Sequence, residues 1–228
     1  MQKIITYIDR GTNYVLLLFF LLLILIGGYT IYDTILIYDQ ADPDLRSFRP
    51  IEGESWDMKA FSEDVVAWLT VDNTTIDYPV MQGRDNNEYL NKDPFGDFSL
   101  SGSLFLDVRN AEDFSDPYSL IYGHHMEYGK MFGALDEFLD EGYFSTHRTA
   151  TLTVTDKVYN IRFFACIEAD ASVQEIFAPT ETDGTLAYVR EHASIWYEPE
   201  GEKMLALSTC KFPQTTDRII VFGVFENE

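Results

Sequence analysis

The sequence contains little of what several common kinds of functional site require. Its two cysteines, Cys166 and Cys210, are too few for a disulfide-rich scaffold and form no CxxC pair that would bind zinc. No HExxH motif occurs, and His147 and His192 stand far from any other histidine in the sequence. We find no glycine-rich phosphate loop and no internal repeat. We therefore expect no metal and no bound cofactor.

Basic residues are also scarce. The chain has 16 Lys and Arg against 38 Asp and Glu, a formal net charge of −22. Phosphate binding needs clustered Lys and Arg to displace counterions, and no such cluster is visible. The charge balance argues against a nucleic-acid partner and favours cationic or neutral partners over anionic polymers. The apolar share of 46% is nevertheless that of a globular protein with a packed core.

Charged residues are missing altogether between residues 11 and 32. Residues 14–26, YVLLLFFLLLILI, are wholly apolar, and residues 14–32 are long enough, at about 1.5 Å per residue, to nearly cross a hydrocarbon core of about 30 Å. A cleaved signal peptide would need a small-x-small cleavage site, which the following Gly-Gly-Tyr-Thr matches poorly. We predict a transmembrane signal anchor at residues 14–32.

The charges on the two sides of this segment predict its orientation. Lys3 and Arg10 precede it, whereas Asp33 and Asp39 follow it. By the positive-inside rule, residues 1–13 are cytoplasmic and everything after the anchor is exported. Residues 33–54 mix a short apolar patch with Asp, Pro and Gly, which is typical of a membrane-proximal spacer rather than of a core. Residues 55–228 then form one extracellular domain.

The exported domain begins with a segment of helical spacing and continues with strand patterns. In residues 56–71, Phe61, Val65 and Leu69 recur at helical intervals, which predicts an amphipathic helix. Seven later segments are rich in β-branched and aromatic residues and are bounded by turn residues, which predicts strands at 75–80, 102–107, 119–122, 150–155, 158–168, 203–209 and 218–225. Seven or eight strands in one domain indicate a β-barrel or sandwich.

Two helical insertions are expected between these strands, at residues 130–139 and 182–192. The second lies within a long connection between residues 169 and 201. Connections of that length inside a compact domain are usually functional, often as a lid or a substrate-binding loop.

Cys210 ends an apolar strand in LALSTC, and a polar turn, KFPQTTD, separates it from the next strand, which begins at Arg218. A thiol at a strand end is accessible to a substrate, and a guanidinium eight residues later can return beside it on the neighbouring strand. Cys166, in contrast, lies inside an apolar run and is typical of a small buried hydrophobe. A Cys166–Cys210 disulfide is disfavoured for this reason, although the sequence alone leaves it open.

Gly123, His124 and His125 follow the strand SLIY. An imidazole at a strand exit can pair with a thiol, acting as base toward an incoming nucleophile and as acid toward a leaving amine. Taken alone, two adjacent histidines fit a surface loop or a weak metal site equally well.

Taken together, these features resemble the sortase family: an apolar anchor, a strand ending in YGH, a strand ending in LSTC, and an arginine that opens the following strand. The family's TLxTC-like motif reads ALSTC here, so the leading Thr is replaced by Ala206. Residues 64–107 and 121–135 look most like class B sortases, although that class commonly has Asn where this chain has His125. The resemblance implies a mainly β fold, a sortase-like closed β-barrel of seven or eight strands with an N-terminal helix and short helical insertions, preceded by one transmembrane helix.

The resemblance also implies a reaction. Cys210 would be the nucleophile, His124 the acid and base, and Arg218 the oxyanion stabiliser, with Ser208 and Thr209 binding substrate. The enzyme would cleave a C-terminal sorting motif of LPxTG or NPxTG type in secreted proteins and hold the product as a thioester. An amine of the lipid-linked peptidoglycan precursor would then release it, at the cell membrane of a Gram-positive bacterium.

Three alternatives remain. The chain could be a pilin polymerase, in which a pilin lysine is the acceptor, or a membrane-tethered cysteine protease, in which water is preferred to amines. A non-enzymatic adhesion or scaffold module is disfavoured, because the Cys, the His and the Arg are all present. For Arg218 alone, the competing interpretation is a surface ion pair with Asp217 or Asp156.

Overall fold

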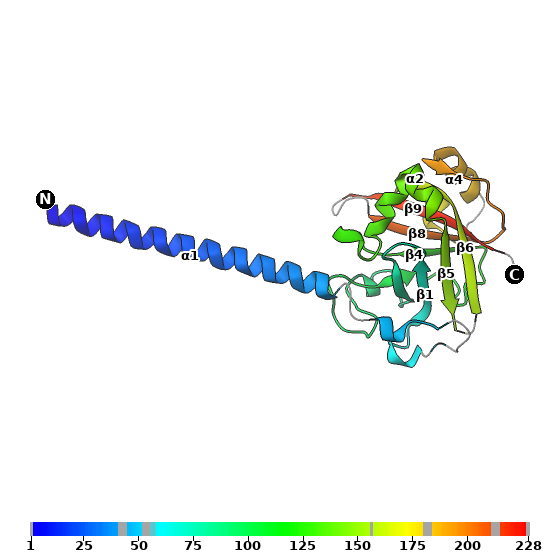
Figure 1. The fold of residues 1–228 in the computed structure, drawn as a ribbon, viewed down its shortest axis with the longest axis horizontal. Helices are drawn as coiled ribbons and strands as arrows, with labels where there is room; N and C mark the ends of the chain where they lie inside the picture. Colours follow the sequence, from blue (N-terminus) through cyan, green and yellow to red (C-terminus); the bar gives the residue numbers. More distant parts are fainter. Residues whose placement is uncertain are drawn as a thin grey trace. The chain divides into compact units, whose positions relative to one another are not determined.

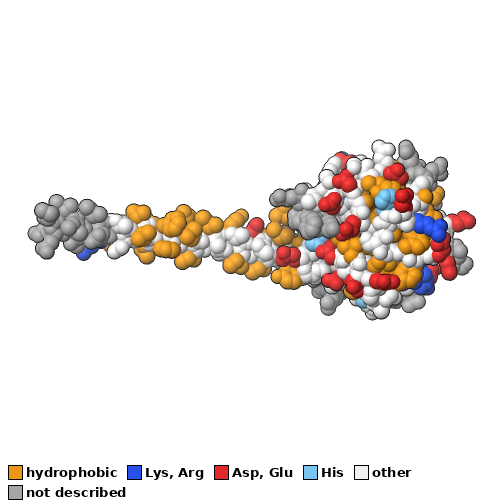
Figure 2. Space-filling model, turned by 90° about the horizontal axis from the view of Figure 1, so that it is seen from above, with side chains coloured by type: hydrophobic (Ala, Val, Ile, Leu, Met, Phe, Trp, Pro, Cys, Tyr) orange, Lys and Arg blue, Asp and Glu red, His pale blue; other side chains and the backbone are white. Residues whose placement is uncertain are grey.

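The structure, a computed structural model, describes residues 2–40, 45–51, 56, 58–155, 157–179, 184–210 and 215–226. It contains two compact units, residues 1–39 and residues 40–228. The first unit is helix α1 (Gln2–Gln40), drawn as one uninterrupted helix in Figure 1. Within it, Arg10–Ile37 is long and apolar enough to cross a membrane, which is wider than the 14–32 predicted from the sequence. Hydrophobic side chains lie along the visible face of this helix in Figure 2.

The second unit is a β-barrel (Figure 1). The strands that the structure describes form one sheet in the order β5-β1-β2-β3-β4-β8-β9-β6-β7, and β5 also pairs with β6. That additional pairing closes a ring of eight strands, while β7 lies alongside β6 outside the ring. The bounds are β1 (Val65–Val71), β2 (Asp77–Met81), β3 (Leu104–Leu106), β4 (Tyr118–Tyr122), β5 (Thr149–Val154), β6 (Lys157–Asp170), β7 (Ile195–Trp196), β8 (Met204–Cys210) and β9 (Asp217–Phe225).

Two hydrophobic clusters lie on opposite faces of the barrel wall. Residues from every side of the ring fill the interior cluster, among them Leu69, Leu104, Ile121, Leu207 and Val221. The outer cluster covers β4, β8, β9 and β6 and includes Tyr118, Leu120, Ala206, Ile220 and Phe222. Because side chains alternate between the faces of a strand, each of these strands contributes to both clusters.

Short helices occupy the connections. They are α2 (Glu141–Thr146), α3 (Gln174–Phe177) and α4 (Thr185–His192), with 3-10 turns at η1 (Arg46–Phe48), η2 (Met58–Ala60), η3 (Glu88–Leu90), η4 (Glu127–Gly129) and η5 (Gly133–Leu139). The helical insertion predicted at residues 130–139 corresponds to η5. That predicted at 182–192 corresponds to α4, with its first two residues outside the described part. Ile176 of α3 and Val189 of α4 are fully buried in the outer cluster, so both helices cover that face of the barrel.

The helix predicted within residues 56–71 is wrong for most of its length. Among the residues of this segment that the structure describes, only Met58–Ala60 is helical, as a single 3-10 turn, and Val65–Val71 is strand β1. Strand β1 pairs with β2 on one edge and β5 on the other, and six of its seven residues are buried. A strand buried on both faces lacks the polar alternation that identifies strands, so its apolar residues match a helical period by coincidence.

Part of the predicted spacer, residues 33–54, contributes to the domain. Leu45 is buried in the interior cluster, and Phe48 packs edge-on against Phe61 with the ring centroids 5.5 Å apart. The indole of Trp56 donates a hydrogen bond of 2.9 Å to the carbonyl of Phe48. The first described residues after α1 are therefore held on the barrel. Residues 41–44 and 52–55 lie outside the described part.

Candidate active site

Cys210 and Arg218 are direct partners across two neighbouring strands. Strand β8 ends at Cys210, β9 runs antiparallel to it, and the register pairs Cys210 with Arg218 and Ser208 with Ile220. Residues paired directly in an antiparallel ladder point to the same face of the sheet. The sequence prediction that the guanidinium returns beside the cysteine is therefore matched by the backbone register. The side chain of Cys210 itself lies outside the described part.

His124 reaches the same end of the barrel from the other side of β8. Strands β4 and β8 are parallel neighbours, and their register pairs Tyr122 with Ser208. The amide of Gly123 continues this ladder with a hydrogen bond of 3.1 Å to the carbonyl of Ser208. Because both chains run in the same direction, His124 and Cys210 each lie two residues beyond a paired position. His124 is thus brought to the same end of three adjacent strands as Cys210 and Arg218, although it lies far from them in the sequence.

The alternation of side chains indicates which face these residues occupy. On β8 and β9, Ala206 and Phe222 pair with each other and belong to the outer cluster, whereas Leu207 and Val221 pair and belong to the interior cluster. The pair Cys210 and Arg218 lies four residues along each strand from the outer pair Ala206 and Phe222, an even number. Arg218 therefore belongs to the outer face, which is the face that α3 and α4 cover.

The ring of His124 is oriented by a backbone carbonyl. Its Nε2 lies 2.8 Å from the oxygen of Leu90 in η3. A carbonyl oxygen only accepts hydrogen bonds, so Nε2 carries the proton and Nδ1 is left to take or give one. The ring is half-buried. This geometry suits a general acid and base whose tautomer is determined by a fixed partner.

Two glycines make this arrangement possible. A Cβ on Gly123 would lie 2.4 Å from Leu104 and 2.7 Å from Phe132, both fully buried. Gly102 has a φ of +59°, and a Cβ there would lie 2.6 Å from the carbonyl oxygen of Leu90. At Gly102 only glycine allows so close an approach of two backbones, and at Gly123 a side chain would overlap the buried side chains of Leu104 and Phe132. The tight packing around Gly123 therefore explains why the YGH motif has a glycine at this position.

His125 points elsewhere. Its Nε2 lies 2.7 Å from Oδ2 of Asp136, and the two residues line a surface cavity of about 700 Å³ beside η4 and η5. The adjacent histidines thus have different partners, a carbonyl for one and a carboxylate for the other.

The described contacts of Arg218 are with backbone carbonyls. One guanidinium nitrogen, Nη1, donates to the oxygens of Thr215 and Asp217 at 3.0 and 3.2 Å. Nearby, hydrogen bonds from Ser172 and Thr216 lower the pKa of Asp170 to about 2, and the positive charge of Arg218 contributes to the same shift. Asp156, one of the ion-pair partners considered for Arg218, lies outside the described residues.

Ser208 and Thr209 are both buried within β8. Because side chains alternate along a strand, Ser208 lies on the outer face with Ala206, and Thr209 lies on the interior face with Leu207. Among the described residues, neither hydroxyl oxygen has a hydrogen-bond partner. Buried hydroxyls normally have one, so these two are exceptions within the described part of the chain.

Cys166 is a free thiol, fully buried in the middle of β6, and burial raises the pKa of its thiol well above the ordinary value. A thiol that is neither accessible nor ionised is a poor nucleophile. Its interpretation as a small buried hydrophobe is confirmed.

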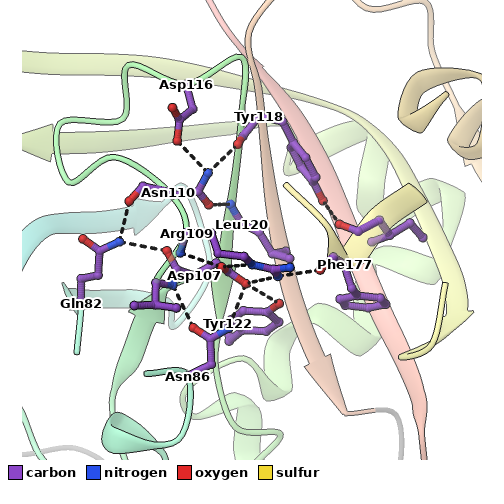
Figure 3. A network of polar contacts seen from close by, with 12 residues as sticks. Gln82, Asn86, Asp107, Arg109, Asn110, Asp116, Tyr118, Leu120, Tyr122 and Phe177 are labelled. Atoms are coloured by element: carbon purple, nitrogen blue, oxygen red, sulfur yellow. Dashed lines mark hydrogen bonds and ion pairs between the residues drawn. The ribbon is translucent and has the colours of Figure 1, made fainter. Parts of the chain in front are cut away.

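A buried polar network beside the site was not predicted from the sequence (Figure 3). Asp107, which follows β3, is fully buried and receives two hydrogen bonds, of 2.8 and 2.7 Å, from the guanidinium of Arg109. Asn86 and the hydroxyl of Tyr122 also donate to it. Burial opposes ionisation of Asp107, but the hydrogen bonds from Arg109 outweigh it, so the pKa of Asp107 lies below its ordinary value. The sequence feature that could have indicated this network is the pair of charged residues, Asp107 and Arg109, that follows the apolar residues LFL.

The sequence matches known proteins over most of the domain. The family model described as Sortase domain matches residues 69–226. A curated relative, Sortase B of Listeria monocytogenes, is 36% identical over 118 residues, which cover 52% of this chain and 48% of that protein. Sortase B of Staphylococcus aureus is 24% identical over 176 residues, covering 72% and 71% respectively. The chain thus spans about half the length of the Listeria protein and more of the Staphylococcus one.

Solved structures share the fold. The Streptococcus pyogenes protein Spy0129, described as a class B sortase involved in pilus biogenesis, has a TM-score of 0.69 and 41% identity, covering 75% of this chain and 96% of that one. A Staphylococcus aureus sortase B–substrate complex has a TM-score of 0.70 at 21% identity, covering 88% and 97%, and supports the fold alone.

Proposed function

Because this chain belongs to the sortase family, we propose that it is a membrane-anchored cysteine transpeptidase of class B type that acts on proteins carrying a C-terminal sorting motif. The observation that carries this proposal is the strand register, which pairs Cys210 with Arg218 and brings His124 to the same level from the other side of β8. We assign Cys210 as nucleophile, His124 as acid and base, and Arg218 as oxyanion stabiliser.

In the first half-reaction, the Cys210 thiolate attacks the threonine carbonyl of an LPxTG- or NPxTG-like motif. Negative charge develops on the carbonyl oxygen, where Arg218 donates a hydrogen bond, an interaction worth roughly 3 kcal/mol for one well-placed donor. The bond between Thr and Gly breaks, and His124 gives a proton to the leaving amine. The acyl group is then held as a thioester on Cys210.

In the second half-reaction, an acceptor amine replaces the thiolate. His124, now neutral, takes a proton from the amine as it attacks the thioester carbonyl. The carbon–sulfur bond breaks, an amide bond forms, and the thiolate of Cys210 is regenerated. Ser208, at the floor of the outer face, and Thr209, through its backbone, contribute to holding the peptide.

Helix α1 fits this chemistry. A single-pass anchor with the N-terminus in the cytoplasm would place the domain outside the cell, where secreted proteins and a lipid-linked wall precursor both arrive. Confinement to the same membrane raises the effective concentration of enzyme and substrates without any added contact. A freely diffusing acceptor would gain little from it.

The acceptor has two candidates. The first is an amine of the lipid-linked peptidoglycan precursor. The second is a pilin lysine, and the specific observation favouring it is the 41% identity to Spy0129, described as involved in pilus biogenesis. The acidic charge of the chain, visible over the domain in Figure 2, is compatible with either cationic group.

The test is a mass-spectrometric assay of the full chain with a library of sorting peptides and several amines, including a wall-type peptide amine and a lysine side chain. We expect a thioester adduct on Cys210 and an amide product with one class of amine. Cys210→Ala should abolish both while leaving the fold intact, and Cys166→Ala is the matched control. Peptide cleavage that persists in Cys210→Ala would overturn the assignment, and a preference for water over every amine would make the protein a protease.

A further inference from the structure

The long connection between β6 and β7 begins beside the proposed site. Strand β6 ends at Asp170, which pairs with Asp217, one residue before Arg218. The amide of Ala171 donates a hydrogen bond of 2.9 Å to the carbonyl of Thr216, and the hydroxyl of Thr216 binds the carboxylate of Asp170. The chain then enters α3, whose Ile176 packs into the outer cluster. Helix α3 therefore lies on the face to which Arg218 belongs, and the backbone register pairs Arg218 with Cys210.

The C-terminal end of α3 is held by two side chains from the barrel. The last carbonyls of a helix have no partner within the helix. In α3, the carbonyl of Glu175 accepts a hydrogen bond of 2.6 Å from the hydroxyl of Thr185 at the start of α4. The carbonyl of Ile176 accepts a hydrogen bond of 2.9 Å from the hydroxyl of Tyr118, and that of Phe177 accepts one of 2.6 Å from Nη2 of Arg109 (Figure 3). We call Tyr118 and Arg109 the α3 clamp.

Both members of the clamp are themselves fixed. The guanidinium of Arg109 is held by the fully buried carboxylate of Asp107, to which Tyr122 also donates. Tyr118 is fully buried and stacks on Phe222, with the ring centroids 6.2 Å apart. Two donors from the barrel, one on β4 and one in the turn after β3, therefore hold the last two carbonyls of α3. Arg109 shares the carboxylate of Asp107 with Tyr122, two residues before His124.

We infer that Arg109 and Tyr118 are positioning residues that hold α3 as one wall of the groove in which the sorting peptide binds. This inference rests on the proposed transpeptidase function and names a determinant of peptide affinity at the same site. Arg109 and Tyr118 touch no reacting atom, so their loss changes how well the peptide is held, and thus KM, rather than the chemical step. A purely structural role would instead lower stability and leave KM unchanged.

The variants are Arg109→Lys, Tyr118→Phe and their combination. A lysine keeps the positive charge near Asp107 but cannot bond the carboxylate through two nitrogens and reach Phe177 as well. Tyr118→Phe removes only the bond to Ile176. Arg84→Lys is the matched control, because Arg84 makes an ion pair with Glu88 at the surface and its side chain is 91% exposed.

Hydrogen exchange gives a readout independent of activity. Within α3, the amides of Ile176, Phe177 and Ala178 bond to carbonyls at Val173 and Gln174, so their exchange reports whether the helix holds together. In the full chain, we expect each clamp variant to speed this exchange about tenfold, the factor that corresponds to one lost hydrogen bond. We expect KM for the peptide to rise by about the same factor, with kcat and Tm close to wild type. The control should change none of these.

Three outcomes would overturn the inference: unchanged α3 exchange in both single variants, faster exchange with an unchanged KM, or a fall in Tm and kcat without a change in KM. If the wild-type chain cleaves no sorting peptide, the proposed function fails. The exchange measurement then still shows whether the clamp holds α3, so the two failures are distinguishable.

Discussion

The hydrogen-bond partners of single residues distinguish side chains that the sequence alone does not separate. His124 and His125 are neighbours in sequence, yet one ring is bound to the carbonyl of Leu90 and the other to the carboxylate of Asp136. Cys210, His124 and Arg218 could be proposed from the sequence because each lies at a strand end next to a recognisable motif. The Asp107 network could not, because the bond from Arg109 to Phe177 joins residues 68 positions apart and depends on the fold.

Replacement of Arg218 by lysine tests the role of its planar fork. If Arg218 stabilises the oxyanion, Arg218→Lys should lower kcat/KM by about 10²-fold or more, because lysine reproduces the bidentate geometry poorly. Stability should change little, since exposed charge pairs contribute only about 0 to 1 kcal/mol. Single-turnover release of the leaving peptide measures the effect. Near-wild-type acylation would remove Arg218 from the mechanism.

The two histidines can be separated by alanine variants. We expect His124→Ala to lose most turnover, because it removes the proposed acid and base. His125→Ala should retain much of its activity, since it breaks only the pair with Asp136 at the edge of the surface cavity. Steady-state transpeptidation with one peptide and one amine gives the ranking. The reverse order would move the acid and base role by one residue.

Strands β4, β8 and β9 bring His124, Cys210 and Arg218 to one end of the barrel. Seven of the nine strands were predicted from the sequence, since their β-branched and aromatic runs are bounded by turn residues. Strand β1 was mistaken for a helix because it is buried on both faces, and β7 is only two residues long, too short for any periodic signal. The parallel pairing of β4 with β8, which brings His124 to the level of Cys210, has no signature in the local sequence.

The end of β4 offers a test of this packing. Gly123→Ala places a methyl group against Leu104 and Phe132 in a filled interior, so we expect a loss of about 1 to 3 kcal/mol in the free energy of unfolding. Because His124 follows directly, kcat should also fall. Urea unfolding and peptide cleavage measure the two effects. Gly142→Ala, where the nearest atom is an Asp140 side-chain oxygen at 3.0 Å, is the control. An unchanged kcat in Gly123→Ala would show that the strand end tolerates the shift.

The whole molecule divides into an apolar helix and a barrel that buries its own core. The sequence analysis divides the chain into an anchor at residues 14–32, a spacer at residues 33–54 and a domain at residues 55–228. Leu45 and Phe48, which lie within the predicted spacer, pack against the core of the barrel. We propose that the folded domain includes them.

Shortened chains test this boundary. A chain that begins at Gln40 should fold and cleave a soluble peptide as well as the full chain does, since the second compact unit begins there. A chain that begins at Trp56 loses Leu45, Phe48 and the hydrogen bond from Trp56 to Phe48, and should be less stable by roughly 2 to 4 kcal/mol. Chemical denaturation compares the two. Equal stability would show that residues 45–51 only rest on the surface.

The position of β9 has a consequence for the order in which the protein matures. This strand is the last in the described chain, yet it lies between β8 and β6 in the closed ring. Because β9 follows the other eight described strands in the chain, the ring stays open until β9 is inserted. Cys210 gains Arg218 opposite it only at that step. A chain that is still being synthesised therefore holds the proposed nucleophile without the arginine proposed to act beside it.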